Sequence, residues 1–381
     1  MHSPIEKLTA VRTALKAAFV ERDEVIDGVL TAIIANEHIL LLGPPGTAKS
    51  AMVNALAGAI DGGRCFTRLL TKFSTPEELF GPVSLAALKA DRFRRQTDGY
   101  LPDAHIGFVD ECFKGSSSIL NTLLTLMQER KFDNDGQRQD CPLLTLVGAS
   151  NELPDGQELD AFFDRFLVKF WIGYVTNRDR LKTLLASPNG EPNITEKLTV
   201  DDIRELRSRA QRMTVPDAVI ELIINIKSSL EHKGLIASDR TWRKLVRLAQ
   251  ARAVLDGADC DFDEVDSEHL EVLADSLWRE PSQRALVVAE VGKYANPIVA
   301  EAQQLLDAVR ENFAKFPSKI TDDNMAVAAR INREVKQIAA RGAELMANAP
   351  AHKAGRLREA MGEIQKLHGA MIKSVQVVSG T

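Results

Sequence analysis

The segment 43–50 reads Gly-Pro-Pro-Gly-Thr-Ala-Lys-Ser and directly follows the apolar run 39–42. Backbone N–H groups of such a glycine-rich turn, together with the N-terminus of the next helix, surround an anion. Lys49 then reaches the β- and γ-phosphates of a nucleotide, and the Ser50 hydroxyl ligates Mg²⁺. The segment therefore predicts a site for ATP and Mg²⁺, with these nucleotide-binding residues: Gly43, Pro44, Pro45, Gly46, Thr47, Ala48, Lys49, Ser50 and Ala51.

Ala48 departs from the usual pattern, because glycine normally precedes the lysine. An alanine fits there if its backbone φ is negative. The alternative interpretation is an ordinary strand-turn-helix with a chance Lys-Ser pair. A second motif downstream makes that alternative the weaker one.

Asp110 and Glu111 follow the apolar run 106–109, which is typical of a Walker B element. We expect Asp110 to hold Mg²⁺ through water. Glu111, on the other side of the strand end, is expected to polarise the water that attacks the γ-phosphate. Taken alone, such a pair is as commonly a strand that meets a solvated turn. Downstream of a phosphate-binding turn, the catalytic interpretation is favoured.

Asn151 ends another apolar strand pattern, at 144–149, and its amide is expected to lie beside Asp110 and Glu111, where it orients the attacking water. Without that context, an asparagine after a strand is a turn residue. Arg165 stands at the end of a short helix pattern, and it cannot easily reach the γ-phosphate of its own chain. It suits an arginine finger presented to a neighbouring subunit. The alternative for Arg165 is a surface residue paired with Asp164 or Glu158.

These residues need a scaffold that brings strand ends together. Apolar runs suited to parallel strands recur along residues 1–175 and predict an α/β fold with a parallel five-stranded αβα core. A helix at 121–130 is followed by a hairpin at 131–141, because Asn134-Asp135-Gly136 is a hairpin turn signal. The five runs lie at 39–42, 66–70, 106–109, 143–147 and 166–172.

Helical patterns fill the rest of the chain. Residues 176–280 predict an all-α lid domain, with amphipathic stretches at 218–230 and 241–255. Residues 281–381 predict a C-terminal helical hairpin or three-helix region. Its helices at 281–316, 323–348 and 352–378 are expected to pack within their own chain; contact with other subunits or a partner is the alternative.

Composition bounds the class of protein. The chain has 381 residues, 45% of them hydrophobic and 27% charged, which fits two or three globular domains. Its four cysteines are scattered, so neither a disulfide framework nor a zinc site is implied. The net charge of -5 gives no general attraction to nucleic acid or anionic lipid. We expect a cytoplasmic protein without membrane insertion, because no long apolar segment or secretion signal is visible.

With these motifs the chain resembles the MoxR branch of the AAA+ ATPases, and most closely its RavA-like subgroup, over residues 5–280. The resemblance implies that Arg240 is a sensor 2 residue that reaches from the lid to the phosphates of ATP. It also implies that 79–100 is a helix-2 insert facing a central channel or a partner. Without the resemblance, the interpretation would be that Arg240 is an exposed basic residue and that the segment 79–100 is a solvent-exposed hairpin. The supporting motifs are the segment 43–50, Phe-Ser-Thr-Pro-Glu-Glu-Leu-Phe-Gly-Pro at 73–82, Gly-Tyr-Leu-Pro at 99–102, Asn-Thr-Leu-Leu at 121–124, Ala-Ser-Asn-Glu-Leu-Pro at 149–154 and Ser-Asp-Arg at 238–240.

The same resemblance implies a remodelling motor that acts as a homo-oligomer, a hexameric ring. A von Willebrand factor A domain protein would be supplied in trans, and the target would be a client protein complex. RavA-like proteins carry a small β-domain near the C-terminus, and no strand-rich insertion is visible in 281–381. The alternatives are a nucleotide-gated scaffold with little turnover and a nucleic-acid motor. The hairpin 131–140 mixes positive and negative charges and lacks aromatic residues interleaved with basic ones, so no nucleic acid is expected.

Overall fold

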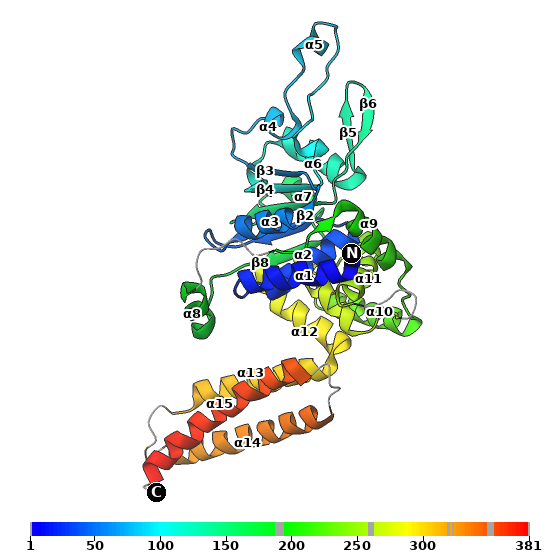
Figure 1. Ribbon diagram of the computed structural model, residues 1–381. Helices are drawn as coiled ribbons and strands as arrows, with labels where there is room; N and C mark the ends of the chain where they lie inside the picture. The colour runs from blue at the N-terminus through cyan, green and yellow to red at the C-terminus, as the bar shows by residue number, and fades with distance from the viewer. Residues whose placement is uncertain are drawn as a thin grey trace. The chain divides into compact units, whose positions relative to one another are not determined.

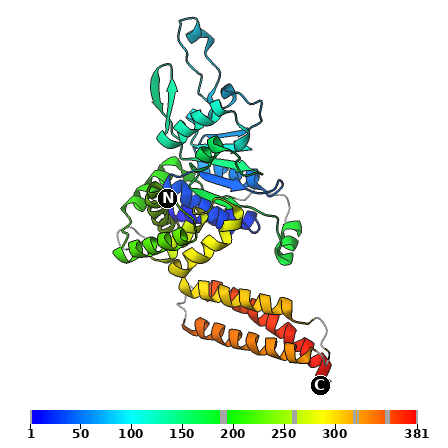
Figure 2. The same cartoon turned by 180° about the vertical axis from the view of Figure 1, so that it is seen from behind.

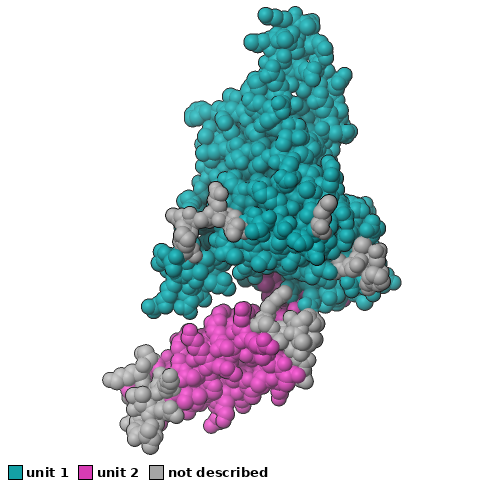
Figure 3. Space-filling model, in the orientation of Figure 1, with its two compact units in different colours: residues 1–224, 230–287 teal, residues 225–229, 288–381 magenta. Residues whose placement is uncertain are grey.

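The computed structural model describes residues 2–186, 194–257, 263–317, 321, 324–348 and 354–379 (Figure 1). The chain forms two compact units, coloured separately in Figure 3. The first contains residues 1–224 and 230–287, and the second contains residues 225–229 and 288–381. The first unit thus contains the α/β core and the lid helices, apart from residues 225–229.

A parallel five-stranded sheet is the centre of the first unit, with strand order β3-β4-β7-β1-β8. Every residue of β1 and of β7 is buried. Because successive side chains of a strand point to opposite faces, both faces of the sheet are covered. The predicted α/β core is confirmed, with strands β1 (Ile39–Leu42), β3 (Cys65–Leu69), β4 (Ile106–Asp110), β7 (Thr145–Ser150) and β8 (Val168–Trp171).

Helices and short strands surround this sheet and form the lid. The helices are α1 (Pro4–Ala18), α2 (Asp23–Ala35), α3 (Lys49–Gly58), α4 (Pro76–Phe80), α5 (Leu85–Leu88), α6 (Ser117–Glu129), α7 (Gln157–Phe163), α8 (Arg178–Ala186), α9 (Val200–Arg212), α10 (Asp217–His232) and α11 (Asp239–Leu255). The 3-10 turns are η1 (Leu101–Asp103), η2 (Cys112–Lys114), η3 (Glu268–Asp275) and η4 (Pro281–Gln283). Strands β2 (Ile60–Asp61) and β9 (Leu198–Thr199) pair in parallel and join the core to the start of the lid.

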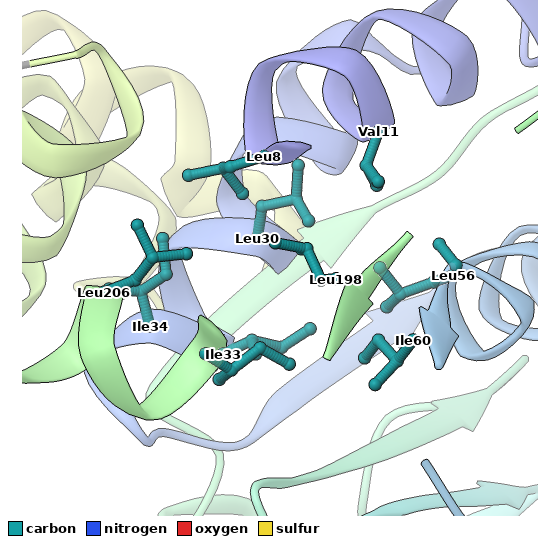
Figure 4. A pocket seen from close by; sticks show the side chains of 11 residues that line it. Leu8, Val11, Leu30, Ile33, Ile34, Leu56, Ile60, Leu198 and Leu206 are labelled. Atoms are coloured by element: carbon teal, nitrogen blue, oxygen red, sulfur yellow. The ribbon is translucent and has the colours of Figure 1, made fainter. Parts of the chain in front are cut away.

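An apolar core fills the space between α1, α2, α3, α9 and the β2–β9 pair, and Figure 4 shows its side chains directed toward one another. The space left among them is about 10 Å³, room for at most one water molecule. This region is a packed core and not a ligand site. It is lined by Leu8, Val11, Leu30, Ile33, Ile34, Leu56, Ala59, Ile60, Leu198, Ile203 and Leu206.

Two projections leave the same end of the sheet (Figures 1 and 2). One is the segment that carries α5, closed by a bridge between Val83 and Arg95. The other is the hairpin of β5 (Lys131–Asn134) and β6 (Gln137–Asp140), with φ values of 58° at Asp135 and 71° at Gly136. Positive φ at both turn residues is typical of a type I′ turn, and the predicted hairpin is confirmed. The Asn134 amide joins the projections, since it accepts from Arg95 N at 2.7 Å and donates to Arg95 O at 3.1 Å.

The second unit is built from α13 (Pro297–Lys315), α14 (Met325–Asn348) and α15 (Ala354–Ser379), preceded by α12 (Arg284–Ala295). The expected single helix over 281–316 is wrong, because the chain breaks at Asn296, whose side chain caps α13, and Pro297 begins the new helix. All regular structure described in this region is helical, as predicted. The three long helices share a core of Ala302, Leu306, Val309, Ile331, Val335, Leu357, Met361, Ile364 and Met371.

Within the part of the chain that the structure describes, no helix combines the length and apolar character needed to cross a membrane.

Candidate nucleotide-binding site

The phosphate-binding turn starts where β1 ends, between β7 and β8. Gly43 has a φ of 140°, and a Cβ on it would lie 2.2 Å from the Ile172 carbonyl oxygen. Only glycine therefore fits at this position. The turn ends at Lys49, the first residue of α3, so the N-terminus of this ten-residue helix faces the turn.

Ala48 adopts a left-handed conformation, with φ 66° and ψ 20°, at the N-cap of α3. The negative φ at which an alanine would fit without strain is therefore not adopted. The turn imposes here the backbone shape that glycine adopts freely, and a Cβ in this region costs about 1–2 kcal/mol. The side chain is exposed, so alanine is tolerated without a steric clash in the core.

Lys49 is folded into the turn, and the residue is only 7% exposed. It donates to Gly43 O at 2.6 Å, to Pro44 O at 3.0 Å and to Asn151 Oδ1 at 3.1 Å. Burial lowers the pKa of Lys49, and the nearby carboxylates of Asp110 and Glu111 oppose this shift. The positive charge of Lys49 thus lies where the turn would receive phosphate.

Ser50 and Asp110 meet beside Lys49. The Ser50 hydroxyl donates to Asp110 Oδ2 at 3.4 Å, and Asp110 Oδ1 accepts from the backbone N–H of Glu111 at 3.0 Å. One hydroxyl and one carboxylate are a suitable partial ligand set for Mg²⁺, which usually takes its remaining ligands from water and phosphate. The arrangement fits a Mg²⁺–nucleotide complex, in which the metal ion would neutralise phosphate charge.

Glu111 and Asn151 are in direct contact. Asn151 Nδ2 donates to Glu111 Oε1 at 2.6 Å, so one amide spans Lys49 and Glu111. Lys114 Nζ lies 3.1 Å from the other carboxylate oxygen of Glu111. This lysine was not identified from the sequence, although its place in the turn after Asp-Glu could have suggested it. The five residues Lys49, Ser50, Asp110, Glu111 and Asn151 form one site at the carboxyl edge of the sheet.

Arg165 and Arg240 lie in a different place, a hollow of about 300 Å³ that we call the basic pocket. It takes Arg165 from the segment before β8 and Arg240 from the start of α11. Its full lining is Asn36, Glu37, His38, Met127, Gln128, Arg130, Arg165, Arg240, Arg243, Lys244 and Arg247. The sequence did not identify Arg243, Lys244 or Arg247, although the spacing 240, 243, 244, 247 follows one face of a helix.

The basic pocket lies at the amino edge of the sheet, opposite the phosphate-binding turn. Residues 36–38 directly precede β1, whereas Gly43 directly follows it. From His38 to Gly43 the chain takes five steps of about 3.3 Å each, so the two edges are about 16 Å apart along β1. Arg165 and Arg240 are therefore brought together with each other and not with Lys49.

The floor of the basic pocket is fixed by hydrogen bonds. His38 Nδ1 accepts from Leu146 N at 2.9 Å, so its Nε2 donates to Met127 O at 2.9 Å. Burial and the adjacent Arg130 lower the pKa of His38 well below its usual value. Arg130 donates to Met127 O at 2.7 Å and to Asn36 O at 2.9 Å, and burial lowers its pKa to about 10.

The rim of the basic pocket carries unbalanced positive charge. Its one carboxylate, Glu37, is paired with Lys244 at 2.6 Å. Among the described residues, Arg240, Arg243 and Arg247 are exposed and make no ion pair, and the buried Nε of Arg165 has no hydrogen-bond acceptor. Asp164, the alternative partner for Arg165, lies 3.5 Å from Arg279, and the Glu158 side chain is outside the described residues. The pocket can therefore bind an anion.

Comparison with protein families gives two matches. Residues 6–208 match the profile described as the MoxR domain in the MoxR-vWA-beta-propeller ternary systems. Residues 218–291 match the AAA lid domain. Together the two profiles cover most of the first unit.

Individual relatives agree with these matches. Uncharacterized protein MJ0812 of Methanocaldococcus jannaschii is 38% identical over 313 residues, which are 81% of this chain and 82% of that protein. Chaperone MoxR1 of Mycobacterium tuberculosis is 24% identical over 222 residues, 56% of each chain. The crystal structure of a candidate ATPase from Cytophaga hutchinsonii has the same fold, with a TM-score of 0.60 and 22% identity over 77% of this chain and 95% of that one.

Proposed function

This chain belongs to the MoxR family of AAA+ ATPases, and from that premise we propose that it is a motor that hydrolyses ATP between the subunits of a ring. The observation that carries the proposal is the separation of the charged residues into two groups at opposite edges of the sheet. One group can bind Mg²⁺–ATP within the chain. The other, the basic pocket, suits phosphate and lies at the opposite edge of the sheet from the phosphate-binding turn of its own chain.

The group at the carboxyl edge would bind Mg²⁺–ATP and activate the attacking water. Lys49 would exchange its bonds to Gly43 O and Pro44 O for phosphate oxygens, and Ser50 with Asp110 would hold Mg²⁺. Glu111 would accept a proton from the attacking water. Asn151, which contacts both Lys49 and Glu111, would orient that water relative to the γ-phosphate.

The basic pocket would complete the site of the adjoining subunit. Arg165 would act as the arginine finger, neutralising charge that develops on the phosphate oxygens in the transition state. Arg240 lies in the same pocket, so we propose that it serves the neighbour's nucleotide as well, rather than its own. A head-to-tail interface of this kind generates a closed ring when its rotation closes.

Partners and targets follow from the family. We propose six subunits, a von Willebrand factor A domain protein in trans and a client protein complex that the motor remodels. The profile description, which names MoxR-vWA-beta-propeller systems, supports the second of these. The description Chaperone MoxR1 supports a remodelling role. The RavA-like subgroup stays a prediction from the sequence, as does a place in the cytoplasm.

Steady-state ATP hydrolysis per subunit, measured against protein concentration with Mg²⁺, tests the proposal. Glu111→Gln serves as the blank. A specific rate that climbs steeply with concentration is expected, because each active site needs two subunits. Turnover above the blank that is independent of concentration, in a chain that sediments as a monomer, would contradict the shared site.

Mixing variants tests the sharing directly. Arg165→Ala and Glu111→Gln subunits should each be nearly inactive alone. A mixture should recover part of the activity, because some interfaces then pair an intact Glu111 with an intact Arg165. Absence of any recovery in mixed rings would count against a finger acting in trans.

A further inference from the structure

Strand β3 has a free edge. It is the outermost strand of the sheet, and within the described part of the chain it pairs only with β4. Ile106 N donates to Arg64 O at 3.1 Å, and Leu70 N donates to Asp110 O at 2.9 Å. Residues two apart in a strand direct their backbone groups to the same side, so those of Thr67 and Leu69 point away from β4. In the described residues, these outward N–H and C=O groups have no hydrogen-bond partner.

The turn that follows β3 holds an aromatic side chain outside the fold. Phe73 is 90% exposed. Ser74 N donates to Thr71 O at 3.1 Å, Thr71 N donates to Ser74 Oγ at 3.1 Å, and Phe73 N donates to Thr71 Oγ1 at 3.2 Å. Ser74 is itself buried, so the turn is anchored and the exposed position of Phe73 is built in.

A hollow of about 470 Å³ lies between the free edge and this turn. Its lining includes the outward strand residues Thr67 and Leu69 and the aromatic ring of Phe73. Leu69 is 56% exposed, so two large apolar side chains flank the hollow. The charged residues that line it, Arg68 and Glu78, are paired with each other and leave no net charge.

From these features we infer that the free edge of β3 and Phe73 form a docking site for an extended polypeptide segment of another protein. The segment adds a strand to β3 through the outward groups of Thr67 and Leu69. Its side chains on one face enter the hollow, against Leu69 and Phe73. The inference goes beyond the proposed motor function and does not depend on it.

The chemistry of the site selects this occupant. Alternating free N–H and C=O groups along an edge are satisfied by another extended backbone, not by an anion or a small apolar molecule. The self-paired charges favour an apolar segment over a strongly charged one. Main-chain recognition of this kind tolerates many sequences, so an unfolded protein without relation to the natural partner is a valid probe.

Fluorescence anisotropy with labelled, reduced and carboxymethylated α-lactalbumin measures the binding. Thr67→Pro removes the outward N–H without removing a bond to β4, and we expect about a tenfold weaker affinity. Thr67→Val is the matched control, because it keeps the N–H and should bind within about twofold of the original chain. Phe73→Ala should also weaken binding about tenfold, and its exposure leaves the fold intact.

Amide hydrogen exchange provides a readout that needs no substitution. Saturation with the probe should slow exchange at Thr67 and Leu69, whose amides are free in the unbound chain. Lack of saturable binding, unchanged exchange in β3, or full affinity in both Thr67→Pro and Phe73→Ala would each overturn the inference. Self-association that Thr67→Pro abolishes would assign the edge to a second copy of the chain and overturn it too.

Discussion

The left-handed alanine before Lys49 makes a prediction about stability. A Cβ at φ 66° costs about 1–2 kcal/mol, and glycine avoids this cost. A glycine also gives the unfolded chain more conformational freedom, which lowers the free energy of unfolding by about 0.5–1 kcal/mol. Ala48→Gly should therefore raise the free energy of unfolding by about 0.5–1 kcal/mol.

Ala51→Gly is a matched control three residues further on. Ala51 is also exposed, but it lies inside α3, where an alanine has ordinary helical geometry. There the same substitution should lower the free energy of unfolding by about 0.5–1 kcal/mol. The two variants thus remove the same methyl group from neighbouring exposed sites, and their effects should have opposite signs.

Scanning calorimetry of the full-length chain without nucleotide measures the difference. Because a chain with two units can unfold in more than one transition, the relevant one is the transition that an ATP analogue shifts upward. A difference of about 1.5 kcal/mol between the variants corresponds to about 3–6 °C in that midpoint. If Ala48→Gly lowers the midpoint as much as Ala51→Gly does, the turn does not hold residue 48 at positive φ.

Other residues give predictions of the same kind. Lys49→Ala should abolish nucleotide binding in a titration with a fluorescent ATP analogue; retained tight binding would remove Lys49 from the phosphate site. Glu111→Gln should bind ATP normally yet turn over about 10²–10⁴-fold more slowly, and near-normal turnover would exclude it as the base. A mixture of Arg240→Ala and Glu111→Gln subunits should hydrolyse ATP faster than the two variants measured separately. If Arg240 instead acts on the nucleotide of its own subunit, the activity of the mixture should equal the sum of the two separate activities. Burial lowers the pKa of Lys169 to about 8, so its protonated form is penalised in the folded state. Between pH 8 and about 10.5 the unfolded state binds more protons than the folded state, so the free energy of unfolding of the original chain should rise by about 3 kcal/mol relative to that of Lys169→Met. Denaturant titration of both proteins at each pH measures this difference. A difference that stays constant with pH would contradict the lowered pKa.

The core was predictable because its sequence signals are local. A parallel strand buried on both faces reads as a short apolar run, and this made the strands of the sheet visible one by one. The hairpin turn at Asp135 and Gly136 was visible for the same reason. The break at Asn296 was missed, because an asparagine followed by proline interrupts a helical pattern without changing its apolar spacing.

In the candidate site, too, the residues of local motifs were predictable and the features set by the path of the chain were not. Lys49, Asp110 and Glu111 belong to contiguous motifs at strand ends, so their meeting at one edge follows from a parallel sheet. The φ of Ala48 was missed because it is set by the path of the turn and not by the residue type. The basic pocket was missed as a unit, since it joins residues more than 200 positions apart in the chain, such as Glu37 and Lys244.

The position of Arg240 matters most for how the motor would work. A residue on the lid that contacts its own nucleotide reports binding within one subunit. In this chain the Lys244–Glu37 pair holds α11 at the amino edge of the core, whereas the phosphate-binding turn lies at the carboxyl edge. If Arg240 and Arg165 serve the same neighbouring nucleotide, the lid and the core of one subunit grip that nucleotide together. Any rotation of the lid against the core would then be driven by the ATP of the adjoining subunit. Each interface would thus help to set the order in which the subunits of the ring hydrolyse ATP.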